Sequence, residues 1–164
     1  MRKILIFGNS GSGKSTLAKE LCNSHGLGHL DLDTLAWEPV SPPKRKSLDE
    51  SERAIYSFIN SNGGWVIEGC YSDLLEMAVP ESNEIIFMTL PVEACIANAR
   101  SRPWEPHKYK SKEAQDANLE MLIAWIAQYP KRVDTFSETA HNELYAKYSG
   151  KKTMIDSNIR NTKR

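Results

Sequence analysis

Short apolar runs alternate along the chain with longer stretches in which apolar residues recur at helical spacing. The apolar runs have the length and composition of buried strands. They lie within residues 3–7, 29–33, 63–69, 82–91 and 152–156. Two of them, HLDLD and WVIEG, carry acidic residues near their carboxyl ends, a first indication of chemistry at one edge of a sheet.

Five helices are predicted between and after these strands. Their apolar residues recur every three or four positions within 14–24, 47–62, 92–102, 113–128 and 131–148. The second helix begins with a capping box, Ser47 followed by Glu50. The last two have predicted buried stripes at Ala114, Met121, Leu122, Trp125 and Ile126, and at Val133, Phe136, Ala140, Leu144 and Tyr148. The proline-rich and basic stretches 37–47 and 103–112 are predicted loops.

Alternating strands and helices predict parallel βαβ units, because each crossover helix packs on one face of the sheet. We therefore expect an α/β fold of three layers, a five-stranded parallel sheet with helices on both faces. No internal repeat is visible, and 164 residues is the size of one domain. The sequence predicts a single domain over residues 1–164.

The first apolar run ends in GNSGSGKST, which satisfies the pattern G-x-x-x-x-G-K-[ST]. Its glycines permit positive φ, so that backbone amides at the start of the next helix can surround phosphates. Lys14 would reach the β- and γ-phosphate oxygens, and the Ser15 hydroxyl would bind Mg²⁺. The pattern predicts a P-loop NTPase fold that binds a nucleoside triphosphate through Gly8, Asn9, Ser10, Gly11, Ser12, Gly13, Lys14, Ser15 and Thr16.

Composition narrows the range of partners. Lysine plus arginine and aspartate plus glutamate number 21 each, so the net charge is zero and nucleic acid is an unlikely partner. The apolar run near the N-terminus spans four residues, too short for a signal peptide or a membrane span. The three cysteines show no CxxC spacing, which suits a reducing cytoplasm; Cys22, Cys70 and Cys95 are interpreted as core-filling residues.

Two classes of P-loop protein do not fit. The chain has no Asn-Lys-x-Asp to read guanine and no Asp-x-x-Gly after a strand, as a GTPase switch requires, and it is too short for a motor. In GNSGSGKST, HLDLDTLAW, WVIEG and RSR it resembles the adenylate kinase-like P-loop kinases. Within that superfamily, LDTLAW and WVIEGCY resemble the DNA-topology-modulation-protein-like group. The resemblance covers about residues 1–132 and implies ATP, Mg²⁺ and a short lid at about 100–112.

Three acidic residues follow or end the second and third strands. Ligands bind at the carboxyl ends of strands in an open α/β sheet, so Asp31, Asp33 and Glu68 should face the γ-phosphate. The resemblance implies that Asp33 holds, and can deprotonate, the acceptor hydroxyl and that Asp31 orients Mg²⁺-bound water. Glu68 is the Walker B-like candidate for the metal, or a contact of the acceptor. The alternatives are that one aspartate caps the next turn and that Glu68 is a solvated strand-end residue.

Basic residues are needed where charge develops on the transferring phosphoryl group. The resemblance places Arg100 and Arg102 among the lid arginines of such kinases, and Arg132 in YPKR is a third candidate. The alternative is that these cations favour the C-terminus of a helix. The lid lysines Lys108, Lys110 and Lys112 are interpreted as solvated.

The acceptor is expected over DTLAWEP, PKRK and CYSD, where Trp37 and Tyr71 could form an apolar wall, although each could equally belong to the core. Arg45 or Arg53 could pair with an anionic group. The favoured hypothesis is a small-molecule kinase, a cytoplasmic monomer or weak homo-oligomer with catalytic residues Lys14, Asp33, Arg100 and Arg102. The alternatives are a nucleotide-binding regulatory protein related to DNA topology, and a plain ATPase.

Overall fold

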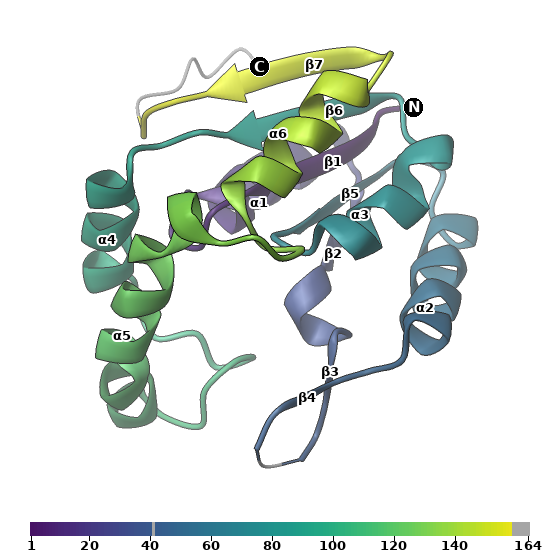
Figure 1. The fold of residues 1–164 in the computed structure, drawn as a ribbon. Helices are drawn as coiled ribbons and strands as arrows, with labels where there is room; N and C mark the ends of the chain where they lie inside the picture. The colour runs from purple at the N-terminus through teal and green to yellow at the C-terminus, as the bar shows by residue number, and fades with distance from the viewer. Residues whose placement is uncertain (41, 159–164) are drawn as a thin grey trace.

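The computed structural model describes residues 1–40 and 42–158. Its main sheet has five parallel strands in the order β2-β5-β1-β6-β7 (Figure 1), as the alternating pattern predicted. The strands are β1 (Lys3–Gly8), β2 (Gly28–Asp31), β5 (Trp65–Gly69), β6 (Glu84–Met88) and β7 (Lys151–Ile155). The strand order places β1, which carries the P-loop motif at its end, in the middle of the sheet.

Helices cover both faces of this sheet, as expected. They are α1 (Lys14–His25), α2 (Leu48–Asn60), α3 (Ser72–Ala78), α4 (Val92–Ser101), α5 (Lys112–Ala127) and α6 (Glu138–Lys147). Short 3-10 turns lie at η1 (Leu32–Thr34), η2 (Val79–Glu81) and η3 (Tyr129–Lys131). In the part of the chain that the structure describes, no helix combines the length and apolar character that crossing a membrane requires.

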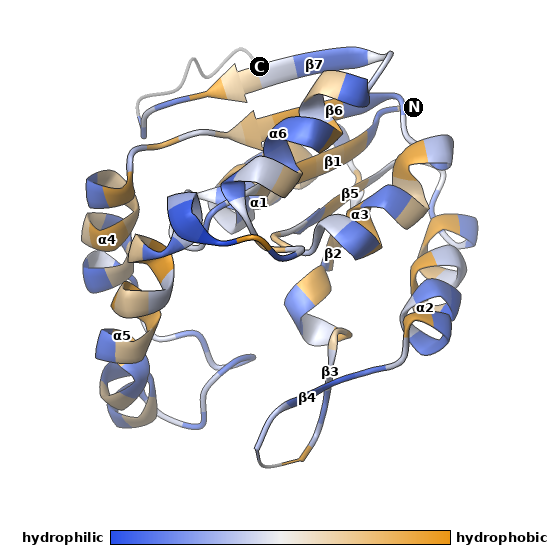
Figure 2. Cartoon of the chain, in the orientation of Figure 1, coloured by the Kyte–Doolittle hydropathy of each residue, from blue (hydrophilic) through white to orange (hydrophobic). Residues whose placement is uncertain are grey.

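Alternation along the strands divides the buried side chains between two cores, one on each face. In β1, Ile4 and Ile6 pack with α1 and α4, whereas Leu5 and Phe7 pack with α2, α3 and α6. The apolar colouring of β1 and β6 in Figure 2 reflects this double burial. A strand covered on both faces needs apolar residues at every position, which is why the continuous run KILIF predicted it correctly.

The second strand is shorter than expected. It ends at Asp31, whose side chain accepts a hydrogen bond of 2.9 Å from the backbone N–H of Asp33 and caps η1. The capping alternative therefore applies to Asp31. The turn moves Asp33 off the strand, and the two aspartates do not share a strand face.

Three further elements differ from the prediction. A two-stranded hairpin, β3 (Trp37–Glu38) and β4 (Lys44–Arg45), lies within the predicted loop 37–47. Helix α3 was not predicted at all. The helix expected from residue 131 begins at Glu138, after the Ser137 side chain accepts a hydrogen bond from Ala140, and Val133 is 99% exposed.

The apolar stripes of the last two helices were only partly correct. On α5, Ile126 is buried and Leu122 half-buried, while Met121 is exposed. The cysteines also divide: Cys95 is buried in the core, whereas Cys22 and Cys70 are half-buried, and all three are free thiols.

Candidate functional site

The loop between β1 and α1 has the backbone shape that its glycines predict. Gly8, Gly11 and Gly13 have φ values of 150°, 76° and 89°, in the region that favours glycine. A Cβ at Gly11 would lie 2.4 Å from the Cys95 carbonyl oxygen, so no larger residue fits there. No side chain caps the N-terminus of α1, and its first-turn N–H groups stand at the edge of this loop.

Two asparagine side chains join the loop to its surroundings, Asn98 from α4 and Asn9 from the loop itself. The Asn98 side chain on α4 donates to the Gly11 carbonyl oxygen at 2.8 Å, and Asn9 donates to the Ile126 carbonyl oxygen at 3.1 Å. The Lys14 ammonium donates to the Asn9 carbonyl oxygen at 2.7 Å. The loop is thereby tied to both α4 and the end of α5.

A pocket of about 590 Å³ opens above the loop at the carboxyl ends of the strands. It brings together most of the predicted site: P-loop residues, two of the three acidic residues and the loop between α4 and α5. The lining includes Ser10, Gly11, Gly13, Lys14, Ser15, Thr16, Asp33, Glu68, Cys70, Arg102, Glu105, His107, Lys108 and Tyr109. The P-loop and an acidic residue from another element therefore face one cavity, as the strand-end argument predicted.

The acidic residues come from two neighbouring strands. Asp31 lies opposite Glu68 in the register of β2 and β5. Glu68 is only 2% exposed and lies 3.3 Å from Nε2 of His29, so it is not a solvated strand-end residue. Asp33 follows on η1 and lines the pocket directly.

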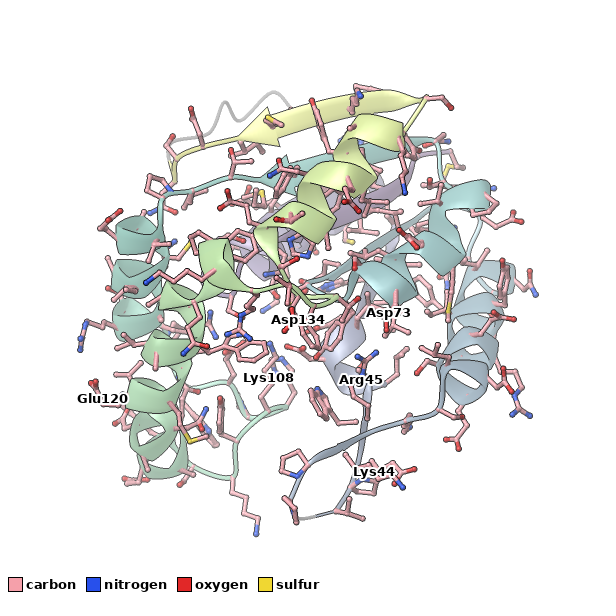
Figure 3. The ribbon with its side chains drawn as sticks, viewed as in Figure 1. Lys44, Arg45, Asp73, Lys108, Glu120 and Asp134 are labelled. Carbon is pink, nitrogen blue, oxygen red and sulfur yellow. The ribbon has the colours of Figure 1, made fainter. Side chains whose placement is uncertain are left out.

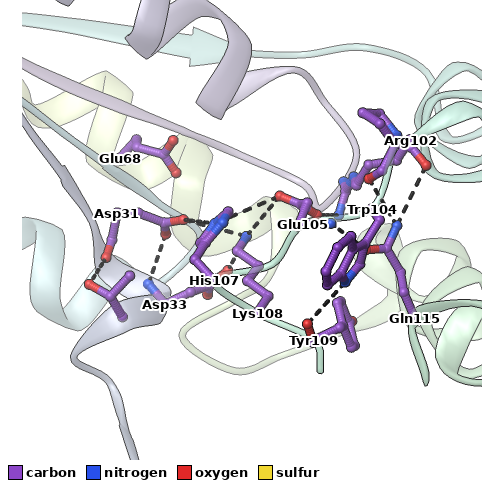
Figure 4. Close-up of polar contacts among 12 residues, drawn as sticks. Asp31, Asp33, Glu68, Arg102, Trp104, Glu105, His107, Lys108, Tyr109 and Gln115 are labelled. Carbon is purple, nitrogen blue, oxygen red and sulfur yellow. Dashed lines mark hydrogen bonds and ion pairs between the residues drawn. The ribbon is translucent and has the colours of Figure 1, made fainter. Parts of the chain in front are cut away.

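The α4–α5 loop, residues 102–111, contacts two of these acidic residues, Asp31 and Asp33 (Figure 4). The Lys108 ammonium lies 2.9 Å from Asp33 and 3.4 Å from Asp31, with its side chain 22% exposed. Glu105 is 3.9 Å from the same ammonium. The interpretation of Lys108 as solvated was therefore wrong, because two aspartates 75 or more positions earlier in the chain hold it in the pocket.

The charges in this cluster change its proton affinities. Burial disfavours the charged form of Lys108 and by itself would lower its pKa. The negative charges of Asp33 and Asp31 have the larger effect, and the pKa of Lys108 is raised. Burial alone would raise the pKa of Asp33, yet Lys108 and the Tyr71 hydroxyl lower it. Burial and the charges of Glu68 and Asp33 raise the pKa of Asp31. Asp33 is thus held as a carboxylate.

A chain of donors supports Asp33 from the other side. The Trp37 indole N–H donates to the Tyr71 hydroxyl at 2.9 Å, and that hydroxyl donates to Asp33. The Arg45 guanidinium lies 5.0 Å from the centre of the Tyr71 ring and 3.3 Å from Asp73. Figure 3 shows Arg45 directed from the hairpin toward Asp73. Trp37 is 38% exposed, whereas Tyr71 is buried.

The three candidate arginines have different surroundings. Arg102 lines the pocket and lies 3.2 Å from Glu105. Arg100 is not among the pocket residues; its side chain is 55% exposed and pairs with Glu120 at 3.6 Å. Arg132 is also outside, with its guanidinium 3.1 Å from the Trp125 ring centre. Only Arg102 is brought to the pocket.

The donor set suits a magnesium ion that is bound mainly through phosphates. Within the described residues, no three or more His, Cys, Asp or Glu side chains form a cluster able to hold a metal by themselves. The hydroxyl of Ser15 and the carboxylate of Glu68 line the pocket, and Asp31 already holds a cation, the Lys108 ammonium. Oxygen ligands of this kind, completed by substrate phosphates and water, are those that Mg²⁺ prefers.

Replacing Lys108 by methionine should destabilise the chain measurably. Asp31 and Asp33 would then repel each other without a cation, and we expect the free energy of unfolding to fall by about 1–2 kcal/mol at low salt. Urea titration measures this loss. Lys110→Met removes an exposed lysine of the same loop and should change stability by less than about 0.5 kcal/mol. Equal losses in the two variants would contradict the role of the ion pairs.

The sheet order, the P-loop and the pocket above the strand ends define a three-layer P-loop fold. Residues 4–119 match the family model AAA_18, described as an AAA domain. This match covers more than two thirds of the chain, so the protein belongs to that family.

Solved structures of small kinases share this fold. The chain is similar to shikimate kinase from Acinetobacter baumannii in complex with shikimate, with a TM-score of 0.55 and 13% identity over 99% of this chain and 87% of that one. A gluconokinase from Sinorhizobium meliloti has a TM-score of 0.55 and 17% identity; the match covers 97% of this chain and 84% of the gluconokinase. A sugar kinase from Janibacter has a TM-score of 0.52 and 12% identity; the match covers 95% of this chain and 85% of the sugar kinase. No curated protein matches the chain.

Proposed function

We propose that the protein is an ATP-Mg-dependent phosphotransferase that moves the γ-phosphoryl group of ATP to an oxygen of a small acceptor. One observation carries this proposal: Asp33, a carboxylate held charged, lines the same pocket as Lys14 and the P-loop amides. A phosphate chain on the P-loop and an acceptor hydroxyl on Asp33 would then share one cavity. The kinase-like fold of the solved neighbours is consistent with this arrangement.

Each residue has a defined task in the proposed reaction. The P-loop amides and Lys14 bind the β- and γ-phosphates, while Arg102 and Lys108 balance charge on the transferring group. Ser15 and Glu68, with Asp31 through water, would hold Mg²⁺, which would neutralise phosphate charge when bound. Arg100 could join only if the lid, residues 100–112, moves and Arg100 leaves Glu120.

Asp33 acts on the acceptor chiefly by orienting it. Lys108 and Tyr71 lower the pKa of Asp33, and a weakly basic carboxylate accepts a hydroxyl hydrogen bond better than it removes the proton. Phosphoryl transfer through a loose transition state requires little proton removal before the phosphorus–oxygen bond to ADP breaks. As the new phosphate ester forms, the acceptor hydroxyl becomes acidic and its proton passes late to the Asp33 carboxylate and from there to water. A hydroxyl that Asp33 holds in line with the γ-phosphate is therefore sufficient for the transfer, without prior deprotonation.

The experiment that tests this function uses Asp33→Asn. We expect ATP affinity, measured by calorimetry, to stay within about twofold, because the ion-pair and hydrogen-bond partners of the Asp33 side chain, Lys108 and Tyr71, lie outside the P-loop. Acceptor-dependent ADP formation should fall about a hundredfold or more, since the hydroxyl loses its charged partner. The acceptors are a panel of sugars, hydroxy acids, nucleosides and nucleoside monophosphates.

The matched control is Asp116→Asn, an exposed aspartate on α5 that pairs with Lys112. It should change neither measurement. A full panel that yields only acceptor-independent hydrolysis by the native chain would reject the kinase proposal in favour of a plain ATPase. Equal loss in both variants would reject the role of Asp33.

The finer classification rests on two motifs. LDTLAW and WVIEGCY support placement in the DNA-topology-modulation-protein-like group, and the three free cysteines support a cytoplasmic location. We take residues 1–164 as one domain. A direct DNA role is not favoured, because the zero net charge gives no large phosphate-binding surface.

A further inference from the structure

A buried histidine lies between the end of helix α5 and the β5–α3 connection. His141 on α6 is 0% exposed, and α6 lies across the face of the sheet (Figure 1). Its ring packs edge-on against two phenylalanine rings. The centre of the imidazole lies 5.6 Å from the ring centre of Phe7 and 6.0 Å from that of Phe87. A polar ring in an apolar core needs partners for both nitrogens, because an unpaired polar group there is costly.

Both ring nitrogens of His141 are used. Nε2 lies 2.8 Å from the Cys70 carbonyl oxygen, and Nδ1 lies 2.7 Å from the Tyr129 hydroxyl. A carbonyl oxygen only accepts, so Nε2 carries the hydrogen and Nδ1 accepts from the tyrosine hydroxyl. Burial lowers the pKa of His141 to about 4, so the ring is neutral near pH 7 and this tautomer persists.

The two partners belong to different parts of the site. Cys70 lines the pocket and directly precedes Tyr71, whose hydroxyl donates to Asp33. Tyr129 begins η3, which follows the last turn of α5, and the first turn of α5 follows the lid. The His141 side chain hydrogen-bonds to both segments, to Tyr129 in η3 and to the Cys70 carbonyl before Tyr71.

We propose that His141 is a positioning residue for the acceptor end of the site. Through the Cys70 carbonyl it fixes the Cys70–Tyr71 segment and so places the Tyr71 hydroxyl on Asp33. Through Tyr129 it joins that segment to η3, which follows the C-terminal end of α5. The inference rests on the proposed function for its effect on turnover, but the positioning itself can be measured without any acceptor.

The first test is a spectroscopic signature in the protein without ligand. The Trp37 indole N–H, bonded to the Tyr71 hydroxyl, gives one of four tryptophan indole signals in a ¹⁵N–¹H spectrum, assigned by single Trp→Phe variants. His141→Phe keeps ring packing and removes both hydrogen bonds. It should shift or broaden the Trp37 signal, while the signal of buried Trp65 stays in place as the folding control.

Two further variants make the test specific. His141→Gln retains a side-chain donor for the Cys70 carbonyl and should restore the native Trp37 signal. Tyr129→Phe removes one hydroxyl and should give a smaller shift than His141→Phe. An unmoved Trp37 signal in folded His141→Phe overturns the inference; if that variant does not fold, an unmoved signal in Tyr129→Phe does so.

The second test separates the inference from the proposed function. With an acceptor found in the panel, His141→Phe should lower kcat about tenfold to a hundredfold while the KM for ATP stays within about twofold. His141→Gln should recover most of kcat. A native kcat in folded His141→Phe overturns the positioning role. A panel without any acceptor rejects the proposed function, and the Trp37 signal then still decides the placement of Tyr71.

Discussion

Lys14→Ala is expected to abolish ATP turnover, with ADP formation at least about a thousandfold below that of the native chain. Lys14 is the positively charged residue that the P-loop contributes to the pocket. Its ammonium lies 2.7 Å from the Asn9 carbonyl oxygen. Without it, the P-loop itself would supply no full positive charge beside the β- and γ-oxygens, and Arg102 and Lys108 of the α4–α5 loop would be the remaining cations of the pocket. ATP affinity should fall as well; calorimetric titration with ATP measures that loss, and an ADP-release assay measures the loss of turnover.

The result can be separated from misfolding. Lys14 is half-buried and makes no ion pair among the residues described, so we expect the Tm of Lys14→Ala to stay close to that of the native chain. Lys147→Ala removes an exposed lysine at the end of α6 and serves as control, with unchanged ATP affinity. Native ATP affinity in Lys14→Ala would mean that the P-loop does not bind the phosphates, and the proposed function would fail with it.

Acidification should destabilise the chain through His141 by up to about 3 kcal/mol. In the folded chain the pKa of His141 is about 4, below its usual 6.5, because burial disfavours the imidazolium and the Lys14 charge adds to this effect. The Cys70 carbonyl and the Asp134 carboxylate act in the opposite direction but are outweighed. Tyr129, the remaining polar group on the ring, is a neutral donor.

The sign follows from proton uptake. Between pH 6.5 and about 4 the unfolded chain protonates this histidine and the folded chain does not, so unfolding is favoured as the pH falls. The contribution is complete above pH 6.5 and is lost by about pH 4. Urea titrations of native chain and His141→Gln at pH 7 and pH 4 isolate it, because other groups cancel in the difference. Parallel losses in both proteins would contradict the buried neutral imidazole.

Local patterns predicted the sheet and the phosphate-binding loop because both are determined over short distances in the chain. KILIF must be a buried strand, and Gly8, Gly13, Lys14 and Ser15 lie within eight residues of one another. Asp31 and Glu68 were placed correctly at strand ends, because parallel strands align their carboxyl ends at one edge, whereas Asp33 lies beyond the strand on η1. Sequence spacing alone did not show that Asp31 caps η1.

Contacts between distant residues were not predictable in the same way. Nothing near Lys108 distinguishes it from Lys110 or Lys112, and its place in the pocket depends on how the α4–α5 loop folds back to η1. The same holds for Arg100 and Arg102, two positions apart, of which only Arg102 faces the pocket. The sequence did carry one unused signal: His141 lies at helical spacing from Leu144 and Tyr148, a single polar ring on an apolar helix face.

The fastening of α5 at its C-terminal end has a consequence for how a ligand enters. Ile126 is buried and its carbonyl oxygen is held by Asn9, so this end of the helix cannot swing without pulling on the P-loop. An opening that leaves this end of α5 in place would bend the chain near Arg102 and Ser111, at the two ends of the connecting loop. Under the proposed function, such an opening would be limited by the reach of that short segment, which would favour compact acceptors over polymers.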